Sequence, residues 1–493
     1  MLRSLPPLGN EVRTETATSL PAEPHTRGPR PPLSHPTMPP HAAPSVATAP
    51  SPRALPQALG GASPLWAVLA FTFLNSISGG VVTTGFAFLA KSAYGFTTTQ
   101  NYALGLLQGI TYIIGALAVG PVLRRLVARW DWLTGRAVLI ILMFVLAAGC
   151  FLPLAVAALG ATDTPPIQGL PEGTTAPASG AWTLWTLIAL YSLLTGVLWP
   201  MVESFLSGGR AGKSLGSTVG KFNIVWSGAL VVSFVAMAPL VEPRPLEVVA
   251  GAGVVHLVSL LLLPFFRRDP GHHADYTPEP HPPVYADLLA VLRLQLPASY
   301  IVFSALSPYL PTAFAQLGIE TKWHTPIAAI WLFTRTITFL ILQLWHGWHG
   351  RWATPIIGGV LLLAGFAAAI LAQPIFSPDV TAPSPETALP VLIAGLTVFG
   401  VGMGTIYAAA LYYAMEVGSA KVDAGGVHEA LIGVGFGGGP ACGLIAAGLV
   451  TAQRLEPRHF EFGVLALVAL LAGPVILYAV AKSTARRAGP RAR

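Results

Sequence analysis

The chain has 493 residues, of which 53% are hydrophobic and only 10% are charged, and its mean hydropathy is +0.63. A soluble domain carries about a quarter charged residues, so this composition excludes an ordinary soluble protein and indicates a membrane protein. The formal net charge of +7 would suit a nucleic-acid partner only if the basic residues gathered into one binding surface.

Apolar stretches recur along nearly the whole chain after residue 62, each long enough for the roughly 20 residues that a spanning helix needs. The predicted fold class is therefore an all-α polytopic membrane protein with twelve transmembrane helices. We place these helices at residues 64–90, 102–124, 136–160, 182–206, 218–241, 246–266, 288–316, 324–346, 353–374, 388–415, 427–451 and 460–481.

Residues 1–61 precede the first predicted helix and are rich in Pro, Ala, Ser and Thr, with no apolar run. Such a segment cannot bury enough apolar surface to fold alone, so we expect a disordered cytoplasmic tail. No short apolar core follows Met1, so a secretory signal is not predicted and the first helix is expected to direct insertion. An organellar transit peptide is the alternative, since the tail is poor in acidic residues.

Basic residues lie mainly on one side of the predicted helices. With the N-terminus in the cytoplasm, the inner loops hold Arg124, Arg125, Arg129, Arg136, Arg210, Lys213, Lys221, Arg267, Arg268, Arg293, Arg351 and Lys421, and the C-terminal end holds Lys482, Arg486, Arg487, Arg491 and Arg493. The opposite side holds Lys91, Arg244, Lys322, Arg454 and Arg458. This asymmetry follows the positive-inside rule, so both termini are expected in the cytoplasm. The basic charge therefore indicates orientation and contact with anionic lipid, and no nucleic-acid partner is predicted.

A polar, Pro-rich stretch at 267–287 separates the sixth and seventh predicted helices and is expected to be a cytoplasmic linker. It divides the chain into an N-terminal six-helix bundle at 62–266 and a C-terminal one at 288–482, followed by a basic tail at 483–493. The two halves correspond weakly, because a Gly-Arg pair closes the turn after the second and eighth helices, at Gly135–Arg136 and Gly350–Arg351. Paired halves of six spans are typical of transporters built from repeats.

These features resemble the major facilitator superfamily, over about residues 62 to 485. The resemblance implies two pseudo-symmetric six-helix bundles that move around a central site. The family's turn after the second helix has an Asp-Arg pair followed by Gly-Arg, whereas here Arg124 and Arg125 come first and Asp131 arrives late. We take Arg125, Asp131 and Arg136 as gate candidates that pair with one another; the alternative is that they are basic anchors at the membrane surface.

The stretch GGVHEALIGVGFGGGPACG contains the pattern G-x-G-x-x-G at Gly433, Gly435 and Gly438. A dinucleotide-binding turn needs a preceding strand within a βαβ unit, and this pattern lies inside an apolar span. Rows of small residues instead let two helices approach closely in lipid, so helix packing is the predicted role. The sequence also has no G-x-x-x-x-G-K-[ST] loop, so direct coupling to ATP is not expected.

No metal or cofactor is predicted. Cys150 and Cys442 both lie inside predicted spans and suggest neither a disulfide framework nor a metal site. His272, His273 and His281 lie in the linker without a fixed ligand spacing, which favours a solvated linker over a metal site.

Strongly polar side chains deep in a span are costly and usually face a cavity, so they are the best candidates for substrate binding or coupling. Arg335 is the foremost of these, because a guanidinium at that depth needs a carboxylate, a carbonyl or an anionic substrate. The other candidates are Asn75, Gln108, Tyr112 and Tyr407. A structural ion pair is the alternative for Arg335, and contact with a neighbouring helix is the alternative for the rest.

Further candidates lie near the cytoplasmic ends of the helices and are expected to form an inner gate. In the first half, Asn223 is placed to hydrogen-bond Glu203, and in the second half Glu416 and Glu429 are expected to form the equivalent pair, beside His428. The alternative is that these residues snorkel to the headgroups or favour a helix terminus.

The leading hypothesis is a secondary active transporter that moves a small organic solute by alternating access, with protons as a candidate coupling ion. The second is a non-transporting membrane sensor or assembly partner of the same fold. An enzyme is not predicted, because no cluster of catalytic groups on facing helices is evident. We expect a monomer in the plasma or inner membrane, with the lipid bilayer as its surroundings.

Overall fold

The computed structural model describes residues 61–160, 180–210, 212–271, 281–417 and 422–488. Within these ranges the regular structure is entirely helical. Residues 1–60 of the predicted tail, residues 272–280 of the predicted linker and the last five residues lie outside the described ranges, and so do His272 and His273.

The first six spans comprise α1 (Leu65–Gly79), α3 (Thr98–Arg129), α4 (Gly135–Gly160), α5 (Ala181–Ser207), α6 (Gly212–Met237) and α7 (Pro245–Ser259). The first span continues from α1 into a π-helix, η1 (Gly80–Thr84), and the sixth continues from α7 into a 3₁₀-helix, η2 (Leu260–Phe265). A short helix, α2 (Phe86–Tyr94), follows the first span.

The remaining spans comprise α8 (Val284–Leu306) with α9 (Leu310–Gln316), then α10 (Thr321–Leu344), α11 (Ala353–Phe376), α12 (Pro385–Val417) and α13 (Val422–Thr451). The last one is α14 (Phe460–Ala488), which a single 3₁₀ turn, η3 (Pro457–His459), precedes.

Twelve described helical segments are long and apolar enough to cross a membrane, as predicted from the sequence. Their ends differ from the predicted ones by a few residues; most are extended, whereas the first and fifth spans end earlier, at Thr84 and Met237. The second span begins at Thr98 instead of residue 102, since Thr97 and Gln100 form a capping box at its N-terminus.

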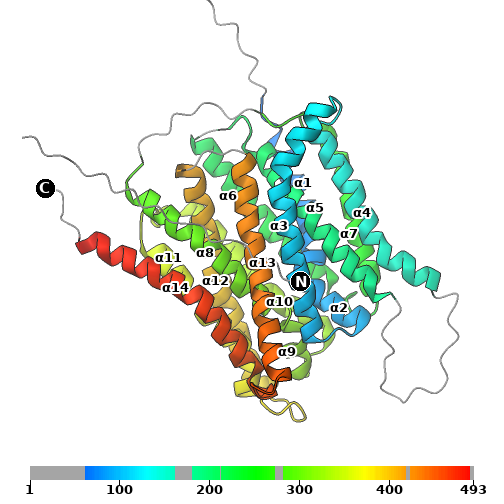
Figure 1. Cartoon of the computed structure of the whole chain (residues 1–493), viewed down its shortest axis with the longest axis vertical. Helices are drawn as coiled ribbons and strands as arrows, with labels where there is room; N and C mark the ends of the chain where they lie inside the picture. Colours follow the sequence, from blue (N-terminus) through cyan, green and yellow to red (C-terminus); the bar gives the residue numbers. More distant parts are fainter. Residues whose placement is uncertain (1–60, 161–179, 211, 272–280, 418–421, 489–493) are drawn as a thin grey trace, which may run out of the picture. The chain divides into compact units, whose positions relative to one another are not determined.

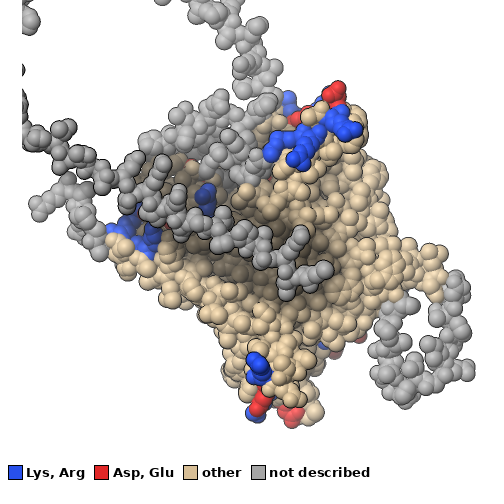
Figure 2. All heavy atoms as spheres, viewed as in Figure 1, with Lys and Arg blue, Asp and Glu red and all other residues tan. Residues whose placement is uncertain are grey.

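Large apolar side chains lie on the outer surfaces of several helices. Phe144 of α4 is 55% exposed, and Leu470 and Leu477 of α14 are each 69% exposed. Charged side chains gather at the two ends instead: where α3 meets α4 and at the end of α14, and again at the bottom of the view, leaving an uncharged band between them across the described part of this face (Figure 2). A band of apolar side chains between charged ends is what a multi-pass membrane protein presents to lipid.

The packing of the helices repeats between the two halves of the chain (Figure 1). The contacts α1–α6, α3–α5 and α4–α7 in the first half correspond to α8–α13, α10–α12 and α11–α14 in the second. Two equivalent contacts join the halves, α3 with α13 and α6 with α10. This is the pattern expected of two pseudo-symmetric six-helix bundles, although the residue boundaries assigned to the bundles stay predictions.

Glycine allows α13 to approach its neighbours at backbone distance. A Cβ atom placed on Gly109 of α3 would lie 2.2 Å from the backbone nitrogen of Gly437, and one on Gly439 would lie 2.3 Å from the carbonyl oxygen of Ile301 in α8. No side chain fits in either place. The glycine pattern of α13 thus serves helix packing, and the G-x-G-x-x-G match lies within a continuous membrane helix.

Candidate functional site

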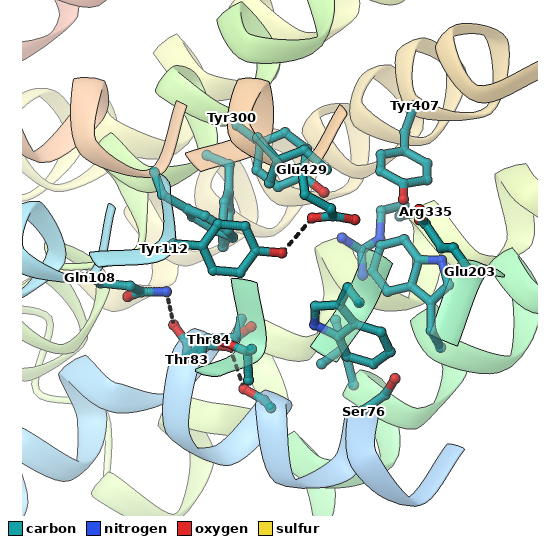
Figure 3. Close-up of a pocket in the computed structure, with 18 of the residues that line it drawn as sticks. Ser76, Thr83, Thr84, Gln108, Tyr112, Glu203, Tyr300, Arg335, Tyr407 and Glu429 are labelled. Carbon is teal, nitrogen blue, oxygen red and sulfur yellow. Dashed lines mark hydrogen bonds between the residues drawn. The ribbon is translucent and has the colours of Figure 1, made fainter. Parts of the chain in front are cut away.

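A cavity lies between the two halves and is lined by residues of the membrane-spanning helices (Figure 3). Its walls come from α1, η1, α3, α5 and α6 of the first half and from α8, α10, α12 and α13 of the second. Its volume is about 100 Å³, whereas a single water needs roughly 10 to 15 Å³. The cavity therefore has room for a small solute.

Arg335 lies in the middle third of α10 and reaches this cavity, although it is only 2% exposed. Its Nε donates a 3.0 Å hydrogen bond to Ser227 Oγ on α6. Its Cζ lies 4.4 Å from the ring centre of Trp226 and 4.8 Å from that of Trp331, so aromatic faces hold the guanidinium. Among the described residues, Nη2 of Arg335 has no hydrogen-bond partner and no carboxylate forms a salt bridge with this side chain.

Aromatic rings continue the wall around Arg335. Trp226 packs edge-on against Tyr407, with ring centres 5.2 Å apart, and Tyr300 packs against Phe436 at the same distance. Tyr112 in turn lies against Phe436 at 5.5 Å. The lining combines flat apolar faces with a few polar groups, which is common for small-molecule sites.

Two carboxyl groups meet at the cavity, one from each half. The hydroxyl of Tyr112 on α3 donates a hydrogen bond to Glu429 Oε2 on α13 (Figure 3). The carboxyl group of Glu203 on α5 lies within hydrogen-bonding reach of that of Glu429. Two carboxyl groups this close in a buried site cannot both ionise without cost, so the pair favours binding a proton.

The π-helix η1 supplies backbone carbonyls to polar side chains around the cavity. The Nε2 of Gln108 donates to the Thr83 carbonyl at 3.2 Å (Figure 3), and Ser307 Oγ donates to the Thr84 carbonyl at 3.3 Å. Both carbonyls lie at the C-terminal end of η1, and π turns are frequent at functional sites. The sequence analysis did not identify this turn; Gly79, Gly80 and Gly85 around the threonines are its local signal.

Four of the five predicted binding candidates line the cavity: Arg335, Gln108, Tyr112 and Tyr407. The fifth, Asn75, does not. Its Nδ2 donates to the Phe71 carbonyl at 2.9 Å and its Oδ1 lies 2.9 Å from His256 Nδ1, while Nε2 of the same histidine contacts Tyr191 at 3.0 Å. Asn75 therefore faces α7 inside the first bundle, where it belongs to a buried polar chain.

The residues of the predicted inner gate do not form the two pairs that were expected. Asn223 accepts a 3.1 Å hydrogen bond from Trp226 Nε1 within α6 instead of bonding Glu203. Glu416 is exposed and lies 3.8 Å from His281 rather than pairing with Glu429. Instead of one pair within each half, Glu203 on α5 and Glu429 on α13 form one pair across the two halves, because these helices are neighbours.

His428 precedes Glu429 and lies at the edge of this region. Its ring centre is 6.3 Å from that of Tyr407, and its Nε2 is buried without a hydrogen-bond partner among the described residues. The structure thus places this gate candidate beside an aromatic residue of the cavity wall.

The turn between α3 and α4 is also stabilised by other contacts than those expected from the sequence. No ion pair joins Arg125, Asp131 and Arg136 within the described ranges. Arg136 Nη1 instead donates to the Phe266 carbonyl at 3.3 Å, and Asp269 Oδ1 accepts from the Gly135 backbone nitrogen at 2.8 Å. The segment after η2 therefore binds this turn. Asp269, which follows the sixth span, provides the acidic contact to the turn that was expected from Asp131.

Polar contacts join the halves at the other end of the molecule. Lys91 Nζ of α2 donates to the Pro311 carbonyl at 3.3 Å and lies 3.4 Å from Thr312 Oγ1, both on α9. The hydroxyls of Thr98 and Thr312 are 2.8 Å apart. Partial burial lowers the pKa of the Lys91 ammonium below its usual range. We refer to Lys91, Thr98, Pro311 and Thr312 as the polar seam.

Comparison with known proteins gives no match at the level of sequence families: no family model and no curated protein matches the chain. Solved structures do match. A variant of the nucleoside transporter NupG has a TM-score of 0.57 and 12% identity, and the match covers 85% of this chain and 99% of that one. A bacterial homologue of the human lysosomal transporter Spinster, in an inward-facing and unoccupied conformation, has a TM-score of 0.57 and 14% identity, covering 84% and 96%.

Both solved proteins are transporters. At 12% and 14% identity the similarity shows the architecture, and it extends over most of each chain. The protein is therefore a multi-pass membrane protein with the major facilitator fold.

Proposed function

We propose that the protein is a secondary transporter that moves a small organic solute across the membrane by alternating access. The observation that carries this proposal is the central cavity, which both halves line and into which Arg335 projects without a counter-ion among the described residues. A buried, uncompensated guanidinium is costly, so a purely structural scaffold has no reason to keep one between its two halves.

The contacts between the halves support a rocking motion. The halves meet most extensively through two helix pairs, α3 with α13 and α6 with α10, and α5 also contacts α13. The polar seam closes one end of the protein. By the positive-inside rule, this end lies on the non-cytoplasmic side of a plasma or inner membrane, and both termini lie on the cytoplasmic side. Separating the seam while closing the opposite end would expose the cavity to each side in turn.

The coupling ion that we propose is the proton. The Glu203–Glu429 pair lines the cavity and joins the halves, so its protonation alters a contact that must change during the cycle. Tyr112 binds Glu429 from α3 and completes the arrangement. We expect the transporter to act as a monomer, because the cavity is built from a single chain.

A cross-link across the polar seam tests alternating access. The variant Thr98→Cys/Thr312→Cys places two thiols where the native hydroxyls are 2.8 Å apart, and the native Cys150 and Cys442 are buried. In proteoliposomes we expect uptake of a labelled solute, from a set that includes a nucleoside and benzoate, to stop on oxidation and to return on reduction.

The single variant Thr98→Cys is the control and should be unaffected by oxidation. A cross-linked protein that transports at the native rate would rule out motion at this seam. If the native protein moves no solute at all, a non-transporting function as a membrane sensor or assembly partner is favoured over transport.

A further inference from the structure

The charge of Arg335 is the least compensated feature of the described interior. The side chain is 2% exposed, and its one hydrogen bond to a described residue is from Nε to the neutral Ser227. Buried charges in proteins are normally paired, because removing an ion from water is expensive. Contact with the faces of Trp226 and Trp331 offsets only part of this cost.

The carboxyl groups of the cavity are not the missing partner. The carboxyl groups of Glu203 and Glu429 lie beside each other, and the Tyr112 hydroxyl donates a hydrogen bond to Glu429. The other polar groups near them are the hydroxyls of Tyr300 and Tyr407 and the imidazole of His428, none of which carries a fixed negative charge. Nη2 of Arg335 therefore remains a buried donor without an acceptor from the described protein.

We propose that the transported solute is an organic monoanion with a flat ring, whose carboxylate or similar acid group accepts a hydrogen bond from Nη2 of Arg335. This inference rests on the proposed transport function and names its substrate class. The Cζ of Arg335 lies over the rings of Trp226 and Trp331, and the unpartnered Nη2 is the donor left for an acid group, as in an arginine–carboxylate pair.

The surroundings also limit the charge and shape of this anion. One guanidinium compensates one negative charge, and the neighbouring carboxyl groups of Glu203 and Glu429 disfavour a second negative charge in the same cavity. Multiply charged anions such as phosphate esters are thereby disfavoured. Tyr300, Tyr407 and Phe436 offer faces and edges against which a ring can stack.

Equilibrium binding to the purified full-length protein in detergent, in chloride-free buffer, tests the inference without requiring transport. The probes are benzoate, benzamide as its neutral counterpart of the same shape, acetate as an anion without a ring, and chloride. A hydrogen bond to a charged group contributes about 1.5–3 kcal/mol, so benzoate should bind roughly ten to a hundred times more tightly than benzamide. Acetate and chloride should bind more weakly than benzoate.

The variant Arg335→Lys keeps the charge but loses the planar fork and the free Nη2, so benzoate affinity should fall about tenfold or more while benzamide is little affected. Arg293→Lys, on an exposed position of α8, is the matched control and should bind as the native protein does. If Arg335→Lys fails to fold, the comparison of probes on the native chain still decides the matter.

Equal binding of benzoate and benzamide, or an unchanged benzoate affinity in a folded Arg335→Lys protein, would overturn the proposal. Chloride binding as tightly as benzoate would replace it with an inorganic-anion site. Benzoate binding without uptake in proteoliposomes would refute transport of this anion but keep the anion site. Uptake of a neutral solute without preference for benzoate would keep transport and refute the anion site.

Discussion

Tyr112 on α3 hydrogen-bonds Glu429 on α13, so one side-chain contact ties the first half of the chain to the second beside the central cavity. The same carboxyl group meets Glu203 on α5. Three helices from both halves thus converge on a single carboxyl group, and any movement of α13 relative to α3 and α5 has to break or re-form these bonds.

The hydroxyl of Tyr112 should contribute to stability. In Tyr112→Phe, Glu429 loses a buried donor, and leaving a buried polar group unsatisfied costs about 1–3 kcal/mol. We expect a lower melting temperature in detergent, measured by the unfolding of the purified protein. Tyr478→Phe removes a hydroxyl from a tyrosine that is 39% exposed on α14 and should leave the melting temperature unchanged. Equal effects of the two substitutions would contradict the assignment.

The carboxyl pair should carry the proton of the transport cycle. In proteoliposomes loaded with a pH-sensitive dye, we expect solute uptake by the native protein to acidify the lumen. Glu203→Gln and Glu429→Gln should each remove that proton movement, because an amide cannot exchange a proton with a carboxylate in this range of pH. The double variant should be no worse than either single one, since the two residues form one site. Proton uptake that persists in both single variants would exclude the pair.

The close contact between α13 and α8 should not tolerate a methyl group. In Gly439→Ala the added carbon would lie 2.3 Å from the Ile301 carbonyl oxygen, so the helices must separate, which costs about 1–3 kcal/mol or more. We expect a lower melting temperature and less folded protein after purification. Gly448→Ala, in the same helix with no atom within 4 Å of the added carbon, should be neutral or slightly stabilising. A stable Gly439→Ala protein would show that this contact is not tight.

The turn between α10 and α11 should lose stability in acid. Burial, together with the nearby His346, lowers the pKa of His349 from 6.5 to about 4, and its ring stacks on Tyr412 at 4.2 Å. Between those two pH values the unfolded chain binds a proton that the folded chain does not, so stability falls as the pH drops from about 6.5 towards 4.

The variant His349→Phe keeps the stacked ring without the titration. Its melting temperature should therefore fall less than that of the native protein between pH 7 and pH 4. His459→Gln removes a histidine from an exposed position and is the matched control. A native-like acid profile for His349→Phe would mean that other groups cause the loss.

Hydropathy alone predicted the twelve spans, because a bilayer forces each crossing segment to be both apolar and helical. Polar side chains inside those spans were predictable as cavity candidates for the same reason, which is how Arg335 and Gln108 were identified. Trp331 was missed, although it lies four residues before Arg335, with Phe339 four residues after it, and this spacing places all three on one helix face.

Which helices face one another could not be read from the chain. Asn75 and Gln108 have similar depth and polarity, yet Asn75 turns towards α7 and Gln108 towards η1, because helix rotation is set by the neighbouring packing. The meeting of Glu203 with Glu429 likewise depends on α5 lying beside α13, a contact between residues more than two hundred positions apart.

The polar seam formed by Lys91, Thr98, Pro311 and Thr312 has a consequence for the cost of opening the protein. Its donors and acceptors can exchange their partners for water with little net change in free energy. An apolar closure of the same area would instead expose surface at about 25 cal/mol for every Å². In the proposed transport cycle, the closed and open forms of this seam therefore differ little in hydration free energy, so binding of the solute can decide between them.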